Sequence, residues 1–201
     1  MEKINKNNKE NIMKKIKIEK ITLNCGTGTD QAKLEKAMKL LKIITNHTPV
    51  KAFTKKRIPA FGIRPGLSIG CKVTIRKKDA TDLLKRLLES IGNKLKEKQI
   101  SNGYFAFGIK EYIEIPGMTF QRDLGILGLD VCVTLTRPGF SIIQKKSRKS
   151  KLPKRSRITK EETIQFMKEN FNTTIEENDH KWLEKTIKTI EEKTRYTEKV
   201  L

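Results

Sequence analysis

The side chains of this chain that could do chemistry are mostly cations, and residue patterns typical of catalysis are missing. The two histidines, His47 and His180, stand beside no nucleophile motif. Residues 26–28 (GTG) resemble part of a phosphate-binding loop but lack its lysine and its third glycine. A tight turn after a strand explains these glycines. The sequence therefore predicts a protein that is not an enzyme and that holds no cofactor.

The three cysteines do not form a metal-binding pattern. Cys25, Cys71 and Cys132 lie far apart, each within a predicted strand, whereas zinc sites usually pair ligands a few residues apart. We expect buried, reduced thiols and no metal, which fits a reducing compartment such as the cytoplasm. No run of 18 apolar residues and no apolar leader core occur in the sequence, so we expect no membrane segment.

A loop at residues 54–65 mixes cations with aromatic rings. Cations neutralise phosphates and release counterions, and rings stack on splayed bases. The alternative is a solvated loop whose rings, Phe53 included, fold back onto the core. The predicted RNA-contact residues are Lys55, Lys56, Arg57, Phe61 and Arg64.

A second basic segment spans residues 144–157 and contains no acidic residue. Its charges repel one another, so it is expected to become ordered on a nucleic acid. The alternatives are a nuclear-localisation signal or a solvated linker. Its predicted RNA-contact residues are Lys145, Lys146, Arg148, Lys149, Lys151, Lys154, Arg155 and Arg157.

The elements that position these side chains follow from periodicity. Apolar residues alternate along 21–25, 67–75, 105–109 and 129–135, which predicts strands. The opposite face of this 67–75 strand carries Lys72 and Thr74, and Arg76 follows in the same alternation. These side chains suit contacts with RNA phosphates and 2′-OH groups. The alternative is a sheet face that is merely solvated.

Helices are expected after Asp30, Asp79 and Thr159. The first two residues are N-cap types, and Thr159 with Glu162 has the form of a capping box. We expect the second helix to carry Ile91 and Leu95 on its apolar stripe. We also expect residues 113–115 to extend the strand predicted at 105–109. The order predicts an α+β fold with helices on one face of an antiparallel sheet, an open RNA-binding face and basic loops.

The net charge of +21 is concentrated in residues 1–158, and no Asp or Glu occurs over residues 36–78. This asymmetry indicates a polyanionic partner. We expect a flexible basic arm over 1–13, an α+β domain over 14–171 and a C-terminal helical extension over 172–201. That extension includes a helix at 180–196, for which Trp182 is the natural anchor.

Several motifs resemble the universal large-subunit ribosomal protein family numbered five, in its archaeal and eukaryotic form. They cover about residues 16–171. The motifs are 18–24 (IEKITLN), 57–64 (RIPAFGIR), 69–76 (IGCKVTIR), 107–117 (FGIKEYIEIPG), 125–131 (GILGLDV), 137–140 (RPGF) and 157–162 (RITKEE).

The resemblance implies a structural, non-catalytic protein of the cytoplasmic ribosome. Its partners would be 5S rRNA, large-subunit rRNA, P-site tRNA through the 54–65 loop, neighbouring large-subunit proteins, and a small-subunit head protein across a bridge. The implied 5S rRNA contacts fall on Asn24, Thr74 and His47, where the family has Gln at the last position. The open alternative is a free-standing RNA-binding assembly factor, which would not co-sediment with large subunits.

Overall fold

The computed structural model describes residues 11–176. The first ten residues of the predicted arm lie outside the described residues. The helix predicted at 180–196, with Trp182, also lies outside them. Residues 11–13 are described: a short 3₁₀ helix (Ile12–Lys14) precedes the first strand.

Six strands form one antiparallel sheet in the order β2-β3-β1-β7-β6-β5. A separate parallel pair joins β4 to β8. The strands are β1 (Lys17–Gly26), β2 (Val50–Phe53), β3 (Ser68–Arg76), β4 (Lys94–Lys96), β5 (Ile100–Ser101), β6 (Tyr104–Ile109), β7 (Leu129–Thr136) and β8 (Thr174–Glu176).

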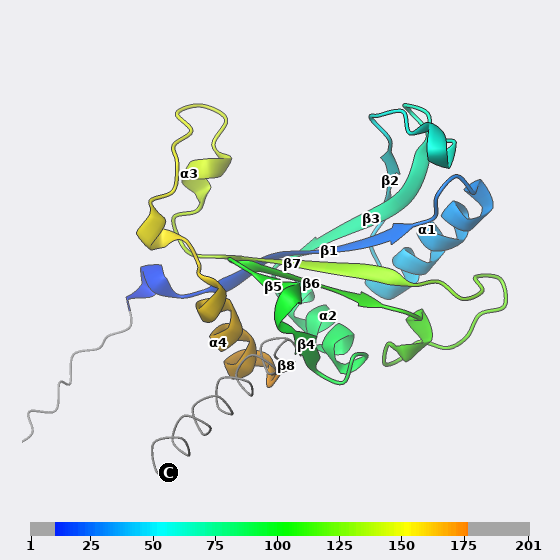
Figure 1. Cartoon of the computed structure of the whole chain (residues 1–201). Helices are drawn as coiled ribbons and strands as arrows, with labels where there is room; N and C mark the ends of the chain where they lie inside the picture. Colours follow the sequence, from blue (N-terminus) through cyan, green and yellow to red (C-terminus); the bar gives the residue numbers. More distant parts are fainter. Residues whose placement is uncertain (1–10, 177–201) are drawn as a thin grey trace, which may run out of the picture.

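The longer helices lie on one side of the sheet (Figure 1). They are α1 (Gln31–Thr45), α2 (Lys78–Glu89) and α4 (Lys160–Phe171), and a short helix, α3 (Ser141–Gln144), follows β7. Figure 1 shows the sheet nearly edge-on, with α1 and α2 on one side. The β2–β3 tip and the α3 region rise on the other side, at opposite ends of the sheet. The predicted α+β class, with helices on one face, is confirmed.

The core lies between the sheet and α1 and α2. Strand alternation buries Leu23 in β1, Val73 in β3 and Val131 in β7, while the neighbouring residues face away from the helices. Leu34 of α1 and Leu87 of α2 belong to the apolar faces of these helices, which pack against this layer, and they are 1% and 0% exposed. Burying one such side chain contributes roughly 1.5–3 kcal/mol.

Two of the three predicted helix starts are confirmed. The Asp30 carboxylate accepts the backbone N–H groups of Ala32 (3.0 Å) and Lys33 (3.2 Å) at the start of α1. Thr159 and Glu162 form the reciprocal capping box of α4. These caps depend on local spacing alone, which is why the sequence predicts them correctly.

The prediction that Asp79 caps the second helix was wrong. Lys77 has a φ of 65° and turns the chain out of β3, so α2 begins at Lys78 and Asp79 lies inside its first turn. A carboxylate at that place still faces the positive end of the helix dipole.

The same helix also ends earlier than predicted. Gly92 and Asn93 both have positive φ, which the right-handed helix does not tolerate. The predicted helical stripe therefore stops before Ile91 and Leu95, and Leu95 is buried in β4 instead. The strand expected at 113–115 is also wrong, because a 3₁₀ helix (Tyr112–Glu114) occupies this segment.

The prediction of three buried cysteines holds for two of them. Cys25 and Cys71 face each other across β1 and β3 and are 2% and 0% exposed. The hydrogen bond to Cys25, and then burial, raise the pKa of the Cys71 thiol well above its usual range. Cys132 is exposed, because it alternates with Val131 and Val133 and so points away from the helices.

Candidate nucleic-acid interface

Three rows of side chains cross the open face of the sheet. Antiparallel pairing places residues of neighbouring strands directly opposite one another, with Cβ atoms roughly 5 Å apart. From β3 through β1 to β7 the rows are Lys72–Asn24–Asp130, Thr74–Thr22–Cys132 and Arg76–Lys20–Thr134.

The rows bring four predicted 5S rRNA-contact residues onto one surface. Lys72 and Arg76 are exposed cations on the same face of β3, and Thr74 lies between them. Asn24 is directly opposite Lys72. The surface thus offers an amide, hydroxyls and cations within one patch, without any helix covering it (Figure 1).

The loop between β2 and β3 is braced by its own backbone. Ile58 and Ile63 exchange two N–H···O bonds of 3.0 and 3.1 Å. At the base, the Thr54 N–H donates to the Leu67 carbonyl (2.9 Å), and the Thr54 hydroxyl donates to the Arg64 and Leu67 carbonyls. The loop therefore has a defined shape without any partner.

The rings of this loop do not fold back onto the core. Phe53 is 62% exposed and Phe61 is 71% exposed. The cations of the loop are exposed as well; they are Lys55, Lys56, Arg57 and Arg64. The alternative in which the rings fold back onto the core is therefore wrong, and the rings and charges of the loop lie at the surface.

The second basic segment has little regular structure of its own. All eight of its predicted RNA-contact residues are exposed; they are Lys145, Lys146, Arg148, Lys149, Lys151, Lys154, Arg155 and Arg157. Its described hydrogen bonds are short-range turns and two long-range bonds, one at each end: the Gln144 side-chain amide donates to the Glu19 carboxylate (2.8 Å), and the Arg157 carbonyl accepts from Arg137.

Arg137 anchors the base of this segment. Its guanidinium donates to the Lys14 carbonyl (3.1 Å), the Arg157 carbonyl (3.4 Å) and the Glu162 carboxylate (2.7 Å). The Arg137 side chain is only 13% exposed. One side chain therefore joins the N-terminal segment, the end of the basic segment and the start of α4.

Comparisons with known proteins identify the family to which this fold and surface belong. The family model described as "Ribosomal protein L5" matches residues 11–64, and the companion model of the C-terminal part of the same ribosomal family matches residues 68–166. The large ribosomal subunit protein uL5 of Sulfolobus acidocaldarius is 42% identical over 168 residues, which is 83% of this chain and 94% of that protein. The chain belongs to the ribosomal protein L5 family.

Two other archaeal relatives agree with this identification. The uL5 protein of Nanoarchaeum equitans is 44% identical and that of Methanosphaera stadtmanae is 42% identical, each over 83% of this chain and 99% of its own length. The L5 family consists of structural ribosomal proteins without enzymatic activity, so the predicted family and the non-enzymatic role are both confirmed. None of the helices described within residues 11–176 is long and apolar enough to cross a bilayer.

His47 lies apart from the strand rows. It follows the left-handed C-cap Asn46 of α1 and is exposed. Its Nδ1 lies 2.7 Å from the Thr45 carbonyl, which can only accept, so Nδ1 is the donor. In the neutral ring, Nε2 is then an acceptor. A glutamine here would offer a donor and an acceptor together, whereas neutral His47 has only one outward group.

Sequence reasoning missed five residues of the open face. The residues that stand in the same rows as the predicted contacts are Lys20, Thr22, Asp130, Cys132 and Thr134. The alternation along 18–24 and 129–135 already placed them opposite the buried residues, and that pattern could have identified them. What the sequence could not supply was the pairing of β1 between β3 and β7.

Electrostatics at Glu162 follow from its partners. Burial on its own would raise the pKa of this carboxyl. The Thr159 backbone N–H and the Arg137 guanidinium outweigh that effect, so the pKa of Glu162 lies below its ordinary value. Glu162 is therefore ionised at neutral pH, and it holds Arg137 in place at the base of the basic segment.

Proposed function

We propose that this L5-family protein is a structural constituent of the large subunit of the cytoplasmic ribosome and that it binds 5S rRNA through the open sheet face. The arrangement of Asn24, Thr22 and Thr74 beside Lys72 and Arg76 carries this proposal. Hydroxyl and amide groups next to cations suit the phosphates and 2′-OH groups of RNA. The relatives' name, large ribosomal subunit protein, supports the assembly.

The β2–β3 loop is the proposed contact with P-site tRNA. Its braced backbone holds Phe61, Lys55, Lys56, Arg57 and Arg64 outward before any RNA arrives. A preformed loop loses less conformational entropy on binding than a loop that must order. A bridge to a protein of the small-subunit head and contacts with neighbouring large-subunit proteins complete the proposed partners.

Large-subunit rRNA is the proposed partner of residues 144–157. The eight exposed cations of this segment have no described acidic partner within residues 11–176. Such a segment releases counterions when phosphates approach, which favours binding to any RNA backbone.

The sheet face is tested with Thr74→Val, which removes one hydroxyl and keeps the shape. We expect 5S rRNA binding to weaken by about 1–2 kcal/mol, roughly 5- to 30-fold, in a gel-shift titration. Thr74→Ser should restore most of the affinity. Thr81→Val is the matched control, because the Thr81 hydroxyl donates to Lys78 on α2, on the helix side of the sheet. Wild-type affinity in Thr74→Val would exclude this face as the 5S site.

The tRNA contact is tested with Arg57→Glu. Reversing one exposed charge beside a phosphate should cost roughly 1–2 kcal/mol in P-site tRNA binding to reconstituted ribosomes. Binding of free 5S rRNA should stay unchanged. Lys39→Glu makes the same charge change on the exposed side of α1 and should leave both readouts unaltered. Equal losses in the two variants would show a general charge effect and contradict the loop contact.

A further inference from the structure

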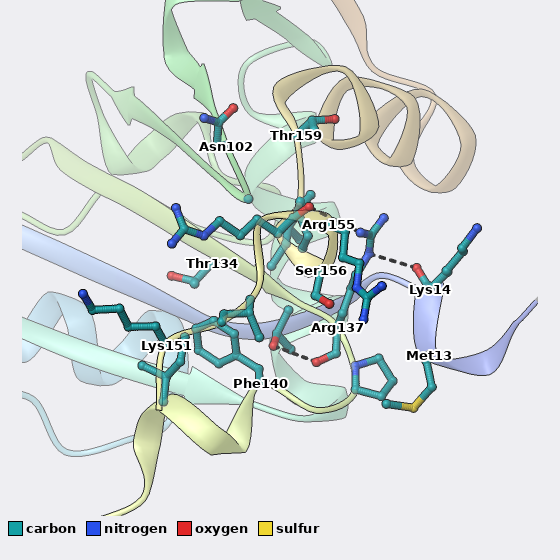
Figure 2. Close-up of a pocket in the computed structure, with 18 of the residues that line it drawn as sticks. Met13, Lys14, Asn102, Thr134, Arg137, Phe140, Lys151, Arg155, Ser156 and Thr159 are labelled. Atoms are coloured by element: carbon teal, nitrogen blue, oxygen red, sulfur yellow. Dashed lines mark hydrogen bonds between the residues drawn. The ribbon is translucent and has the colours of Figure 1, made fainter. Parts of the chain in front are cut away.

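A large hollow lies between the 144–157 segment and the end of the sheet. Its volume is about 1460 Å³, compared with roughly 300–1,000 Å³ for typical small-molecule sites. Four separate stretches of the chain line it, within residues 11–14, 102–104, 134–143 and 149–159. Figure 2 shows Phe140 and Lys151 at one side, Met13 and Lys14 at the other, and Arg137 and Arg155 between them.

The interior of the hollow is apolar and carries aromatic rings. Leu135 and Ile158 are 3% and 8% exposed and form its floor. Phe140, directly before α3, and Tyr104, from β6, add two rings to the lining, and Tyr104 is 54% exposed. An apolar lining of this size is not required for contact with phosphates alone.

The rim of the hollow is strongly cationic. The lining includes six cations and no Asp or Glu; the cations are Lys14, Arg137, Lys149, Lys151, Arg155 and Arg157. Arg137 is paired with Glu162, which leaves five charges without a described acidic partner in residues 11–176. An anionic occupant with an apolar part would match both the rim and the interior.

The hollow is continuous with the open sheet face. Thr134 lines the hollow and also stands in the row Arg76–Lys20–Thr134, which continues to Tyr104 on β6. An RNA strand crossing the face along this row would therefore reach the hollow without leaving the protein surface.

We infer that the hollow takes an unstacked nucleotide of single-stranded RNA, with its base against Phe140 and Tyr104 and its phosphates on Lys151 and Arg155. This inference rests on the proposed function and adds a second, single-strand-specific subsite to it. Rings in a cationic groove are the usual means of holding single-stranded RNA, because every base has a stacking face. The chain's own residues 177–201 match the rim less well, since they carry six acidic and six basic residues.

The test uses the full-length chain and fluorescein-labelled octauridylate, with anisotropy read at one fixed moderate salt concentration. Phe140→Leu keeps an apolar side chain in the lining and removes the ring, so we expect the Kd to rise about 5- to 100-fold, the effect of one lost stack. Phe140→Tyr keeps the ring and should bind as wild type does. Phe120→Leu is the matched control, because Phe120 is an exposed ring that does not line the hollow and belongs to none of the proposed RNA contacts. A blunt eight-base-pair RNA duplex should bind more weakly than octauridylate.

Two results would overturn the inference. One is an unchanged octauridylate Kd in Phe140→Leu, and the other is a duplex that binds as tightly as the single strand. In the first case, the sedimenting mass of the protein is also measured. If Phe140→Leu changes that mass while the octauridylate Kd stays the same, the occupant of the hollow is a second copy of the chain and not RNA. A wild-type gel shift with 5S rRNA separates the two proposals. If the wild-type protein does not shift 5S rRNA but its octauridylate Kd rises in Phe140→Leu, the 5S proposal is refuted and single-strand binding in the hollow is supported.

Discussion

Two basic loops rise at opposite ends of the same sheet, and they are held in different ways. The β2–β3 loop is braced by backbone bonds between Ile58 and Ile63 and by the Thr54 hydroxyl at its base. The 144–157 segment has few bonds of its own, and it is held at its ends by side chains: Gln144 donates to Glu19 of β1, and Arg137 holds the C-terminal end. Both loops present exposed cations on the side of the sheet away from α1 and α2 (Figure 1).

The difference shows two solutions to the same electrostatic problem. Like charges close together destabilise a loop, so something must hold it. In the first loop, local backbone pairing does this, and the surface is ready before RNA arrives. In the second, side-chain bonds to distant residues hold the two ends, and a hollow lies beneath the segment. Small changes should therefore affect the two loops separately.

Arg137→Ala should produce the largest effect. It removes three hydrogen bonds from a side chain that is 13% exposed and leaves Glu162 without its cation. We expect a loss of about 2–3 kcal/mol in the free energy of unfolding, measured in urea. Hydrogen exchange should accelerate across residues 145–157 and stay unchanged at Ile58 and Ile63.

Arg57→Ala is the matched control for that variant. Arg57 is exposed and has no described hydrogen bond from its side chain, so its loss should change stability by less than about 0.5 kcal/mol. If Arg137→Ala unfolds at the same urea concentration as Arg57→Ala, Arg137 does not anchor the segment.

Thr54→Val should affect the other loop, by a smaller amount. In this variant the Leu67 carbonyl still accepts a hydrogen bond from the Thr54 N–H, and the Arg64 carbonyl still accepts one from the Leu67 N–H. The substitution therefore leaves neither carbonyl unpaired. We expect a loss of about 0.5–1 kcal/mol, with faster exchange at Ile58 and Ile63 only. Thr48→Val, at an exposed position before β2, should leave exchange in the loop unchanged. Acceleration in both loops would show that they are not independent.

The two loops also differ in how far the sequence predicted them. Cations and rings at 54–65 indicated exposure, and exposed Phe61 confirms it. The hollow could not be foreseen, because it depends on Met13, Tyr104, Leu135 and Leu152 meeting from four separate stretches. Local residue patterns can be recognised in a sequence, whereas a cavity forms only when separate segments pack together.

The same distinction explains the errors in the predicted elements. Asp30 and the Thr159–Glu162 box were predicted correctly, since a cap needs only its own turn. Leu95 fitted the helical period of the residues before it, yet the turn at Gly92 and pairing with Ile175 of β8 placed it in a strand. Tertiary pairing overrode a local pattern there, as it commonly does in short segments.

The smallest expected effect is a pH dependence confined to the Arg137 anchor. Because the folded-state pKa of Glu162 is lowered, the stabilisation is fully present above the ordinary value of 4.5 and is lost as the pH falls through the lowered one. The Glu162 side chain is 37% exposed, so solvent screening limits the effect to less than about 1 kcal/mol. Unfolding of wild type and Glu162→Gln is compared between about pH 6 and pH 3. Gln keeps the capping box and removes the charge, so the stability difference between the two proteins should shrink as the pH falls. A difference that stays constant over this range would assign the contribution of Glu162 to capping, not to its ion pair with Arg137.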